Sequence, residues 1–146
     1  MLEPAIAKYL LLDTGFWVAV YEERDPNYHR AGGLLSDVSR TTILLPWPIL
    51  YEVLRTRFVR RNDRVARFRS DLTRLRIEKI NDAPYRESAL SDALGGPGVR
   101  SRGLSLVDLV LRRILEDPQL RVDGLVTFDV QHFQDVCRRR RIPVVP

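Results

Sequence analysis

The sequence predicts one α/β domain built on a mostly parallel β-sheet. Short apolar runs of four or five residues alternate with longer segments of helical periodicity. The first run, Tyr9–Leu12, is continuously apolar, which is typical of a strand buried on both faces of a parallel sheet. The chain has 146 residues, the size of one ordinary domain, and we expect that domain to span 1–146.

Five segments are predicted to form the strands of this sheet. They are 9–12, 41–45, 77–80, 124–128 and 142–145. The first strand is expected to end at Asp13 and the fourth at Asp129, while Pro46 and Pro48 end the second. The third segment, Ile77–Ile80, has the weakest strand pattern of the set.

Helices are predicted between the strands, where apolar residues recur at spacings of three and four. They are 16–23, a helix opening at 25–27, 49–58, 63–76, 84–94, 105–116 and a short one ending near 137. Asp25, which precedes Pro26, and Ser105 are the candidate N-caps. The glycine-rich stretch at 95–98 lacks the Gly-Lys-Ser/Thr ending of a phosphate-binding loop, so we interpret it as a plain loop.

The composition is that of a soluble globular protein and excludes several other classes. Hydrophobic residues make up 45% of the chain and charged residues 29%. With Cys137 as the single cysteine and only two histidines, an intramolecular disulfide and a Cys/His zinc site are excluded. The N-terminal segment carries Glu3 and no basic region, and no apolar run reaches the ~18 residues of a membrane span. We therefore expect a cytoplasmic protein with no membrane partner.

Two aspartates are predicted to lie at one edge of the sheet. Asp13 and Asp129 each follow directly on a predicted strand. Ligands of open parallel sheets bind beyond the carboxyl ends of the strands, so both side chains are candidates for a functional site. The alternative is that each is an ordinary turn or helix-capping residue, since aspartate is common at such positions.

Two further acids lie among the apolar residues of predicted helices. Asp108 falls inside the apolar stripe of its helix, where an unpaired charge is costly, and a salt bridge to Arg112 or Arg113 is the alternative. Glu52 is placed similarly, with a pair to Arg55 as the alternative. Gathered around one pocket, the four acids would raise one another's pKa, and a hard cation such as Mg²⁺ or Mn²⁺ would neutralise them.

Four short motifs carrying these acids follow one another along the chain. They are LLLDTGFW with Asp13, LYEVL with Glu52, SLVD with Ser105 and Asp108, and VTFDVQHF with Thr127 and Asp129. In this order, with the acids separated by 39, 56 and 21 residues, they resemble the PIN domain, most closely the toxin type called VapC. The resemblance covers nearly the whole chain. It departs at Leu109, where the family usually has alanine, and at His132, where it often has aspartate.

The resemblance implies a PIN-like fold and a metal-dependent ribonuclease. The fold would have a central sheet of four or five strands in the order of about 3-2-1-4-5, flanked by helices. One or two Mg²⁺ or Mn²⁺ ions would bind, and a metal-bound water would cleave an RNA phosphodiester. The catalytic and metal-binding residues would be Asp13, Glu52, Asp108 and Asp129. The supporting residues, which would orient water or a carboxylate unless they are simple cap or turn residues, would be Thr14, Ser105 and Thr127.

The basic charge of the chain is concentrated in arginine. The net charge is +5, and 22 of the 24 basic residues are arginine, whose planar guanidinium suits phosphate, although such a bias can also reflect genome composition. The segment 55–76 carries nine arginines and a net charge of +7. We expect part of one helix face there to contact RNA phosphates, unless it is merely solvated. The candidate RNA-binding residues are Arg57, Arg60, Arg61 and Arg64.

Two predicted helices carry more apolar surface than one sheet contact would need. The residues are Phe16, Trp17, Val20 and Tyr21 on the first, and Trp47, Ile49, Leu50 and Tyr51 on the third. They either pack in the core or, as the resemblance implies, form the seam of a homodimer and a groove for a cognate antitoxin.

Several other functions compete with the toxin interpretation. A stand-alone PIN nuclease and a catalytically silent PIN domain that binds RNA or protein stay open. A receiver-type phosphoacceptor domain needs a pair of acids after the first strand and a lysine after the last, whereas Asp13 stands alone and Lys8 and Lys79 lie elsewhere. A haloacid-dehalogenase-like phosphatase is excluded, because its Asp-x-Asp motif would need an aspartate at Gly15.

Overall fold

The centre of the molecule is one parallel sheet. The computed structural model describes residues 8–95 and 103–145, and in this part five strands pair in the order β3-β2-β1-β4-β5, all of them parallel. The strands are β1 (Tyr9–Leu12), β2 (Thr42–Pro46), β3 (Arg76–Ile80), β4 (Gly124–Val126) and β5 (Val144–Val145). The predicted fold class and strand order are therefore confirmed.

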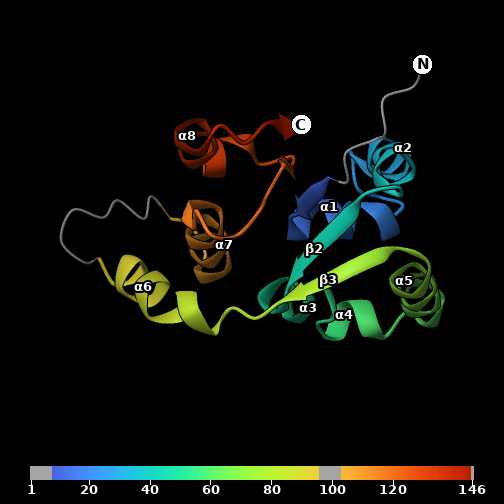
Figure 1. Cartoon of the computed structure of the whole chain (residues 1–146). Coiled ribbons are helices and arrows are strands. Elements are labelled where there is room, and N and C mark those ends of the chain that lie inside the picture. Colours follow the sequence, from blue (N-terminus) through green and yellow to red (C-terminus); the bar gives the residue numbers. More distant parts are fainter. Residues whose placement is uncertain (1–7, 96–102, 146) are drawn as a thin grey trace, which may run out of the picture.

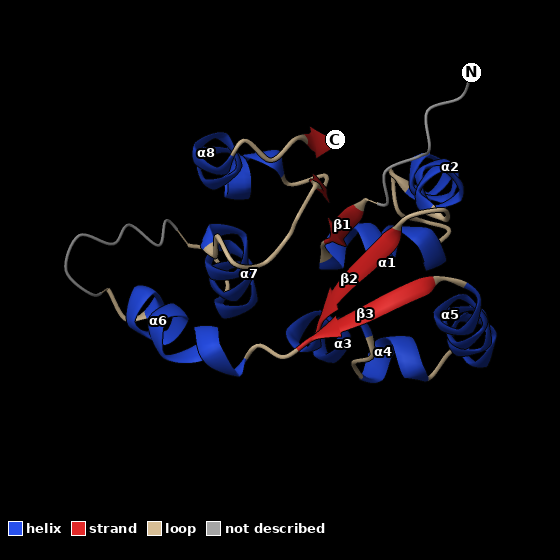
Figure 2. Cartoon of the chain, in the orientation of Figure 1, coloured by secondary structure: helices blue, strands red, loops and turns tan. Residues whose placement is uncertain are grey.

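Eight helices cover this sheet in the part of the chain that the structure describes. They are α1 (Thr14–Tyr21), α2 (Tyr28–Val38), α3 (Trp47–Val53), α4 (Thr56–Val59), α5 (Asn62–Arg74), α6 (Ala83–Ala93), α7 (Leu106–Glu116) and α8 (Val130–Arg140). Helix α1 packs against α2, α3 and α5, while α7 packs against α6 and α8. Figures 1 and 2 show these two groups of helices on opposite sides of the strands.

The start of the second helix differs from the expectation. Helix α2 begins at Tyr28 with Asn27 as its N-cap, so Asp25 is not the cap and Pro26 is not its first residue. The Asp25 carboxylate instead accepts a hydrogen bond from the backbone N–H of Asn27, at 2.8 Å. Aspartate readily forms such a local turn, which here competes with the capping role that the sequence suggests.

The single helix expected over 49–58 is two helices in the structure. Helix α3 starts early, at Trp47, and Pro48 fits in its first turn because the backbone N–H that proline lacks has no partner there. The break comes at Arg55, whose extended backbone (φ −69°, ψ 166°) caps the short helix α4. This bend places Phe58 in the core beside Phe68, a long-range contact that the helical periodicity does not reveal.

The last helix is longer than expected. Helix α8 continues to Arg140, and Arg141 ends it in the left-handed conformation, with φ 55°. Cys137 is buried in this helix. Of the glycine-rich stretch at 95–98, Gly95 has a positive φ of 76°, and 96–98 lie outside the described residues.

The apolar residues predicted on the first helix belong to the core. Phe16, Trp17, Val20 and Tyr21 are all buried. Trp17 and Tyr21 meet Phe68 of α5 edge to face, with ring centroids 5.7 and 5.4 Å apart. Helix α1 is therefore fixed between the sheet and α5, which in turn fixes the residues at its N-terminus.

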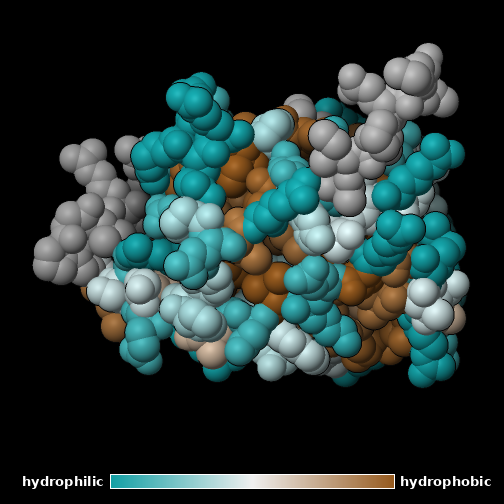
Figure 3. Space-filling view, in the orientation of Figure 1, coloured by the Kyte–Doolittle hydropathy of each residue, from teal (hydrophilic) through white to brown (hydrophobic). Residues whose placement is uncertain are grey.

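The third helix is apolar on its outer side as well. Ile49 and Leu50 are buried, but Trp47 and Tyr51 are 40% and 70% exposed. Figure 3 shows one face of the molecule largely covered by hydrophilic side chains, with hydrophobic residues open to view near its centre and at its lower right. The large hydrophobic side chains exposed in the described residues are Trp47, Tyr51, Leu54, Val59, Leu90, Leu94 and Leu106.

Candidate active site

Asp13 joins the end of β1 to the start of α1. Its backbone N–H donates to the carbonyl of Val126 at 3.2 Å, which continues the pairing of β1 with β4 by one residue. Its Oδ1 accepts a hydrogen bond from the backbone N–H of Phe16 at 2.9 Å, so Asp13 is also the N-cap of α1. An N-cap is usually exposed, whereas Asp13 is 4% exposed.

Thr127 connects the two aspartates at the ends of β1 and β4. Its buried hydroxyl donates to Oδ2 of Asp13 and accepts the backbone N–H of Asp129 at 2.9 Å. A Cβ built on Gly15 would lie 3.6 Å from Oδ2 of Asp129 and 3.7 Å from Oδ1 of Asp13. Both carboxylates therefore border one small space above the first turn of α1, which the glycine leaves open.

The pKa of Asp13 reflects this crowding. Burial raises it from the usual 3.8 to about 6, against the lowering effect of the hydrogen bonds from Thr127 and from the backbone of Phe16. The charges of Asp129 and Asp108 raise it further. Three of the four predicted acids are thus close enough to interact electrostatically.

Glu52 is connected to the start of α1 by a hydrogen bond from Thr14. The hydroxyl of Thr14, the first residue of α1, donates to Oε1 of Glu52 at 2.6 Å. Glu52 is half-buried near the end of α3, and in the described part of the chain no ion pair joins it to Arg55. The ion pair with Arg55, which was the alternative explanation for Glu52, is therefore wrong.

Asp108 lies in the first turn of α7 and is half-buried. The hydroxyl of Ser105, the predicted N-cap, accepts the backbone N–H of Asp108 at 3.1 Å. Arg112 pairs with Asp135 at 2.7 Å, and Arg113 pairs with an aspartate of α6, so neither neutralises Asp108. The salt bridge considered from the sequence does not form.

Two residues that the sequence does not assign to the site border it in the structure. Nδ1 of His132 lies 3.3 Å from Oδ2 of Asp108. Gly15 is the second, because it leaves open the space between Asp13 and Asp129. The departure from the family pattern at position 132 is the feature of the sequence that points to this histidine.

The carboxylates of the predicted site are ligands of the type that binds a hard cation. In the structure they do not form a complete coordination shell. Within residues 8–95 and 103–145, no three His, Cys, Asp or Glu side chains are gathered as a ready metal site. The oxygens of Asp13 and Asp129 border the same space, and Asp108 is near enough to raise the pKa of Asp13. Carboxylate oxygens are the ligands that Mg²⁺ and Mn²⁺ prefer.

The four arginines predicted to bind RNA differ in their surroundings. Arg64 forms an ion pair with Glu22 at 2.9 Å, and its side chain is only 13% exposed. Arg61 is exposed and pairs with its neighbour Asp63 at 3.3 Å. Arg57 and Arg60 are exposed on and beside α4. The last two are therefore better placed than Arg64 to contact a ligand.

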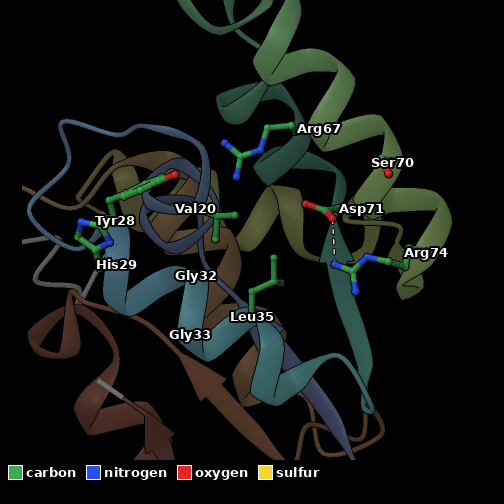
Figure 4. A pocket seen from close by; sticks show the side chains of 10 residues that line it. All are labelled: Val20, Tyr28, His29, Gly32, Gly33, Leu35, Arg67, Ser70, Asp71 and Arg74. Carbon is green, nitrogen blue, oxygen red and sulfur yellow. Dashed lines mark hydrogen bonds and ion pairs between the residues drawn. The ribbon is translucent and has the colours of Figure 1, made fainter.

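A groove separates α2 from α5. Its volume is about 460 Å³, and Figure 4 shows the glycines of α2 on one wall and the arginines of α5 on the other. Its polar groups include Arg67, which stacks on the ring of Tyr21, and Arg74, which pairs with Asp71. The groove lies beside α1, whose apolar residues are already buried, and not against α3.

No family model matches this chain, and no curated protein matches it in sequence. Several solved structures are similar to it, including the following two. VapC20 from Mycobacterium tuberculosis, a sarcin–ricin loop cleaving toxin, has a TM-score of 0.64 at 18% identity, and the match covers 86% of this chain and 94% of VapC20. VapBC2 from Rickettsia felis, bound to a DNA fragment from its promoter, has a TM-score of 0.55 at 16% identity, with 94% and 97% covered.

These likenesses establish the fold of the chain. The resemblance to VapC-type PIN domains that the sequence motifs predict is confirmed at the level of the fold.

Among the described residues, no helix is both long and apolar enough to cross a membrane.

Proposed function

We propose that this chain, which has the fold of VapC toxins, is a metal-dependent endoribonuclease. The observation that carries the proposal is the meeting of Asp13 and Asp129 at adjacent strand ends, with Asp108 close enough to raise the pKa of Asp13. A structural role alone does not explain why three carboxylates are kept near one another, since each disfavours the ionisation of the others. A site that binds a cation does explain it.

The proposed cation is Mg²⁺ or Mn²⁺, as one or two ions. When bound, it would lower the pKa of a water molecule and stabilise the charge that develops at the phosphate. The residues that would hold it are Asp13, Glu52, Asp108 and Asp129.

The neighbouring residues would hold these carboxylates in place. Thr127 and the backbone N–H of Phe16 each bond one oxygen of Asp13, which prevents that carboxylate from turning. Thr14 donates a hydrogen bond to one oxygen of Glu52. Ser105 caps α7 and so fixes the turn that carries Asp108. Carboxylates held in this way lose less conformational freedom when a cation binds.

Cleavage of RNA by purified protein tests this proposal. We expect Asp13→Asn and Asp129→Asn to reduce cleavage at least about a hundredfold in Mg²⁺ or Mn²⁺, because each removes a charge that holds the cation. Asp37→Asn, on the exposed side of α2, is the matched control and should cleave normally. Full activity in Asp13→Asn, with a normal unfolding curve, would show that the site is elsewhere. RNA binding without cleavage by the unmodified chain would favour the silent PIN domain.

The proposed partner is a cognate antitoxin, which would bind in the groove between α2 and α5. VapBC2, whose fold is similar, is a complex, and the groove offers both apolar walls and arginines to a peptide segment. Gly32 lines it, and a Cβ there would meet nothing within 4 Å. Filling the groove with Gly32→Phe should weaken binding of the product of an adjacent small reading frame but leave RNA cleavage unchanged. Ser88→Phe, exposed on α6, is the control.

We also propose that the chain forms a homodimer in the cytoplasm. Four exposed hydrophobic side chains on and beside α3 and α4 support a contact between two copies, namely Trp47, Tyr51, Leu54 and Val59. Sedimentation of the purified chain would give the mass of the assembly, and a monomer at all concentrations would contradict this part of the proposal.

A further inference from the structure

The imidazole of His132 has a buried nitrogen that makes no hydrogen bond. Nδ1 is inaccessible to solvent and makes no hydrogen bond, although the side chain as a whole is 40% exposed. The nearest ion-pairing group is the carboxylate of Asp108, whose Oδ2 lies 3.3 Å away. A buried polar atom without a partner is uncommon in folded proteins and needs an explanation.

A simple hydrogen bond to Asp108 does not explain this nitrogen. Nδ1 and Oδ2 are 3.3 Å apart, at the long end of the hydrogen-bonding range, and no hydrogen bond joins them. Two atoms that bind the same cation are also close together without a hydrogen bond between them, because each points at the cation and not at the other. With ligand bonds of about 2.0–2.2 Å, two atoms on one ion are themselves separated by roughly 3 Å.

The position of His132 is fixed by the helix pair that carries the two side chains. Arg112, one turn after Asp108 on α7, donates from Nη1 to the backbone carbonyl of His132 at 2.7 Å. The same guanidinium makes two hydrogen bonds to Asp135, one turn further along α8, at 2.7 and 2.8 Å. This bidentate contact holds the start of α8 against α7 and so sets the distance between His132 and Asp108.

An imidazole nitrogen changes which ions such a site prefers. Carboxylate oxygens suit Mg²⁺ and Mn²⁺ alike, whereas a nitrogen donor favours the first-row transition ions over Mg²⁺. We propose that His132, together with Asp108, gives the site a nitrogen ligand and that the chain therefore binds divalent transition ions such as Mn²⁺ in preference to Mg²⁺. This inference rests on the proposed function, because it assumes that Asp108 belongs to a cation site.

Binding of Mn²⁺ alone, followed by electron paramagnetic resonance, tests the inference without measuring activity. We expect the bound Mn²⁺ of the unmodified chain to show magnetic coupling to a ¹⁴N nucleus, and His132→Ala to abolish this coupling. The same variant should weaken Mn²⁺ binding by about tenfold to a hundredfold and change Mg²⁺ binding much less. His132→Asp should lose the coupling and shift the preference toward Mg²⁺.

The other histidine provides the matched control. His29 is exposed on α2, so His29→Ala should keep both the ¹⁴N coupling and the ratio of Mn²⁺ to Mg²⁺ affinity. A merely structural role for His132 would weaken both ions equally in His132→Ala, and that result would overturn the inference. Bound Mn²⁺ without ¹⁴N coupling would overturn it while leaving the proposed function intact. Failure of any divalent ion to bind would overturn both the inference and the metal dependence.

Discussion

Ionisation of Asp13 is unfavourable in the folded chain, because burial raises the pKa of its carboxyl group. It caps α1, accepts the hydroxyl of Thr127 and is almost fully buried, and the burial outweighs both hydrogen bonds in its effect on the pKa. The sequence left open whether this residue is a cap or part of a site. At the scale of the residue, the structure shows that Asp13 caps α1 through Oδ1, while Oδ2 accepts the hydroxyl of Thr127, so the cap accounts for only one of its oxygens.

The raised pKa of Asp13 makes a prediction about stability. The folded chain holds the proton of this carboxyl more tightly than the unfolded chain, where the pKa is near the usual 3.8. Its contribution to the free energy of unfolding is therefore full below about pH 4 and is lost as the pH rises through about 6. The loss amounts to roughly 3 kcal/mol. Urea unfolding of the metal-free chain between pH 4 and 7 measures it.

A substitution separates the pH dependence caused by Asp13 from that of the other acidic residues. Asp13→Asn cannot ionise, so the unfolding free energy should fall less between pH 4 and 7 in the variant than in the unmodified chain. Asp37→Asn, on the exposed side of α2, should leave the pH dependence unchanged. Identical slopes for the unmodified chain and Asp13→Asn would mean that Asp13 is not buried as described.

At the scale of the element, the contacts between α7 and α8 could not be predicted from the sequence. Consecutive arginines on α7 have different partners. Arg112 binds Asp135 and the carbonyl of His132, and Arg113 binds Asp92 of α6. One helix is thus tied to both of its neighbours by adjacent residues, because positions i and i+1 point about 100° apart around the axis. The sequence offers Arg112 and Arg113 as possible partners of Asp108, and it does not show which acids they meet.

Arg112→Ala should loosen α8 from α7. We expect the free energy of unfolding to fall by about 1–2 kcal/mol. Most of this loss should come from the partly buried hydrogen bond to the carbonyl of His132, because Asp135 is half-exposed and its ion pair is screened. Guanidinium unfolding measures the change. Arg139→Ala, whose side chain is 60% exposed, is the control and should change stability by less than about 0.5 kcal/mol. Equal effects for the two variants would contradict the role given to Arg112.

At the scale of the whole molecule, the arginine charge is less available than the sequence suggests. The segment 55–76 carries a net charge of +7, but several of its arginines act within the fold. Arg64 pairs with Glu22, Arg67 stacks on Tyr21 and Arg74 pairs with Asp71. The first two contacts join α5 to the end of α1, and the third lies within α5. The charge that an RNA would meet therefore lies mainly on and beside α4.

RNA binding should therefore depend on Arg57 and Arg60 more than on Arg74. We expect the double variant Arg57→Ala with Arg60→Ala to weaken binding of single-stranded RNA equally for all sequences. It should also reduce the slope of log affinity against log salt by about 1, because phosphate contacts release counterions. Arg74→Ala is the control and should keep the slope. Filter binding at several salt concentrations measures both, and an unchanged slope in the double variant would place the RNA elsewhere.

The sequence by itself determined the parallel α/β class, the number of strands, their order through the family resemblance and the cap at Ser105. It also identified the four acids as candidates for a site. These depend on local periodicity and on residue types at fixed spacing, which the chain displays without folding. Only the tertiary structure decided that the aromatic residues of α1 are core, that the chain bends at Arg55 and that His132 meets Asp108. Each of these depends on contacts between residues far apart in the chain, and packing there overrides local preference. The unpartnered nitrogen of His132 becomes visible only when α8 is set against α7.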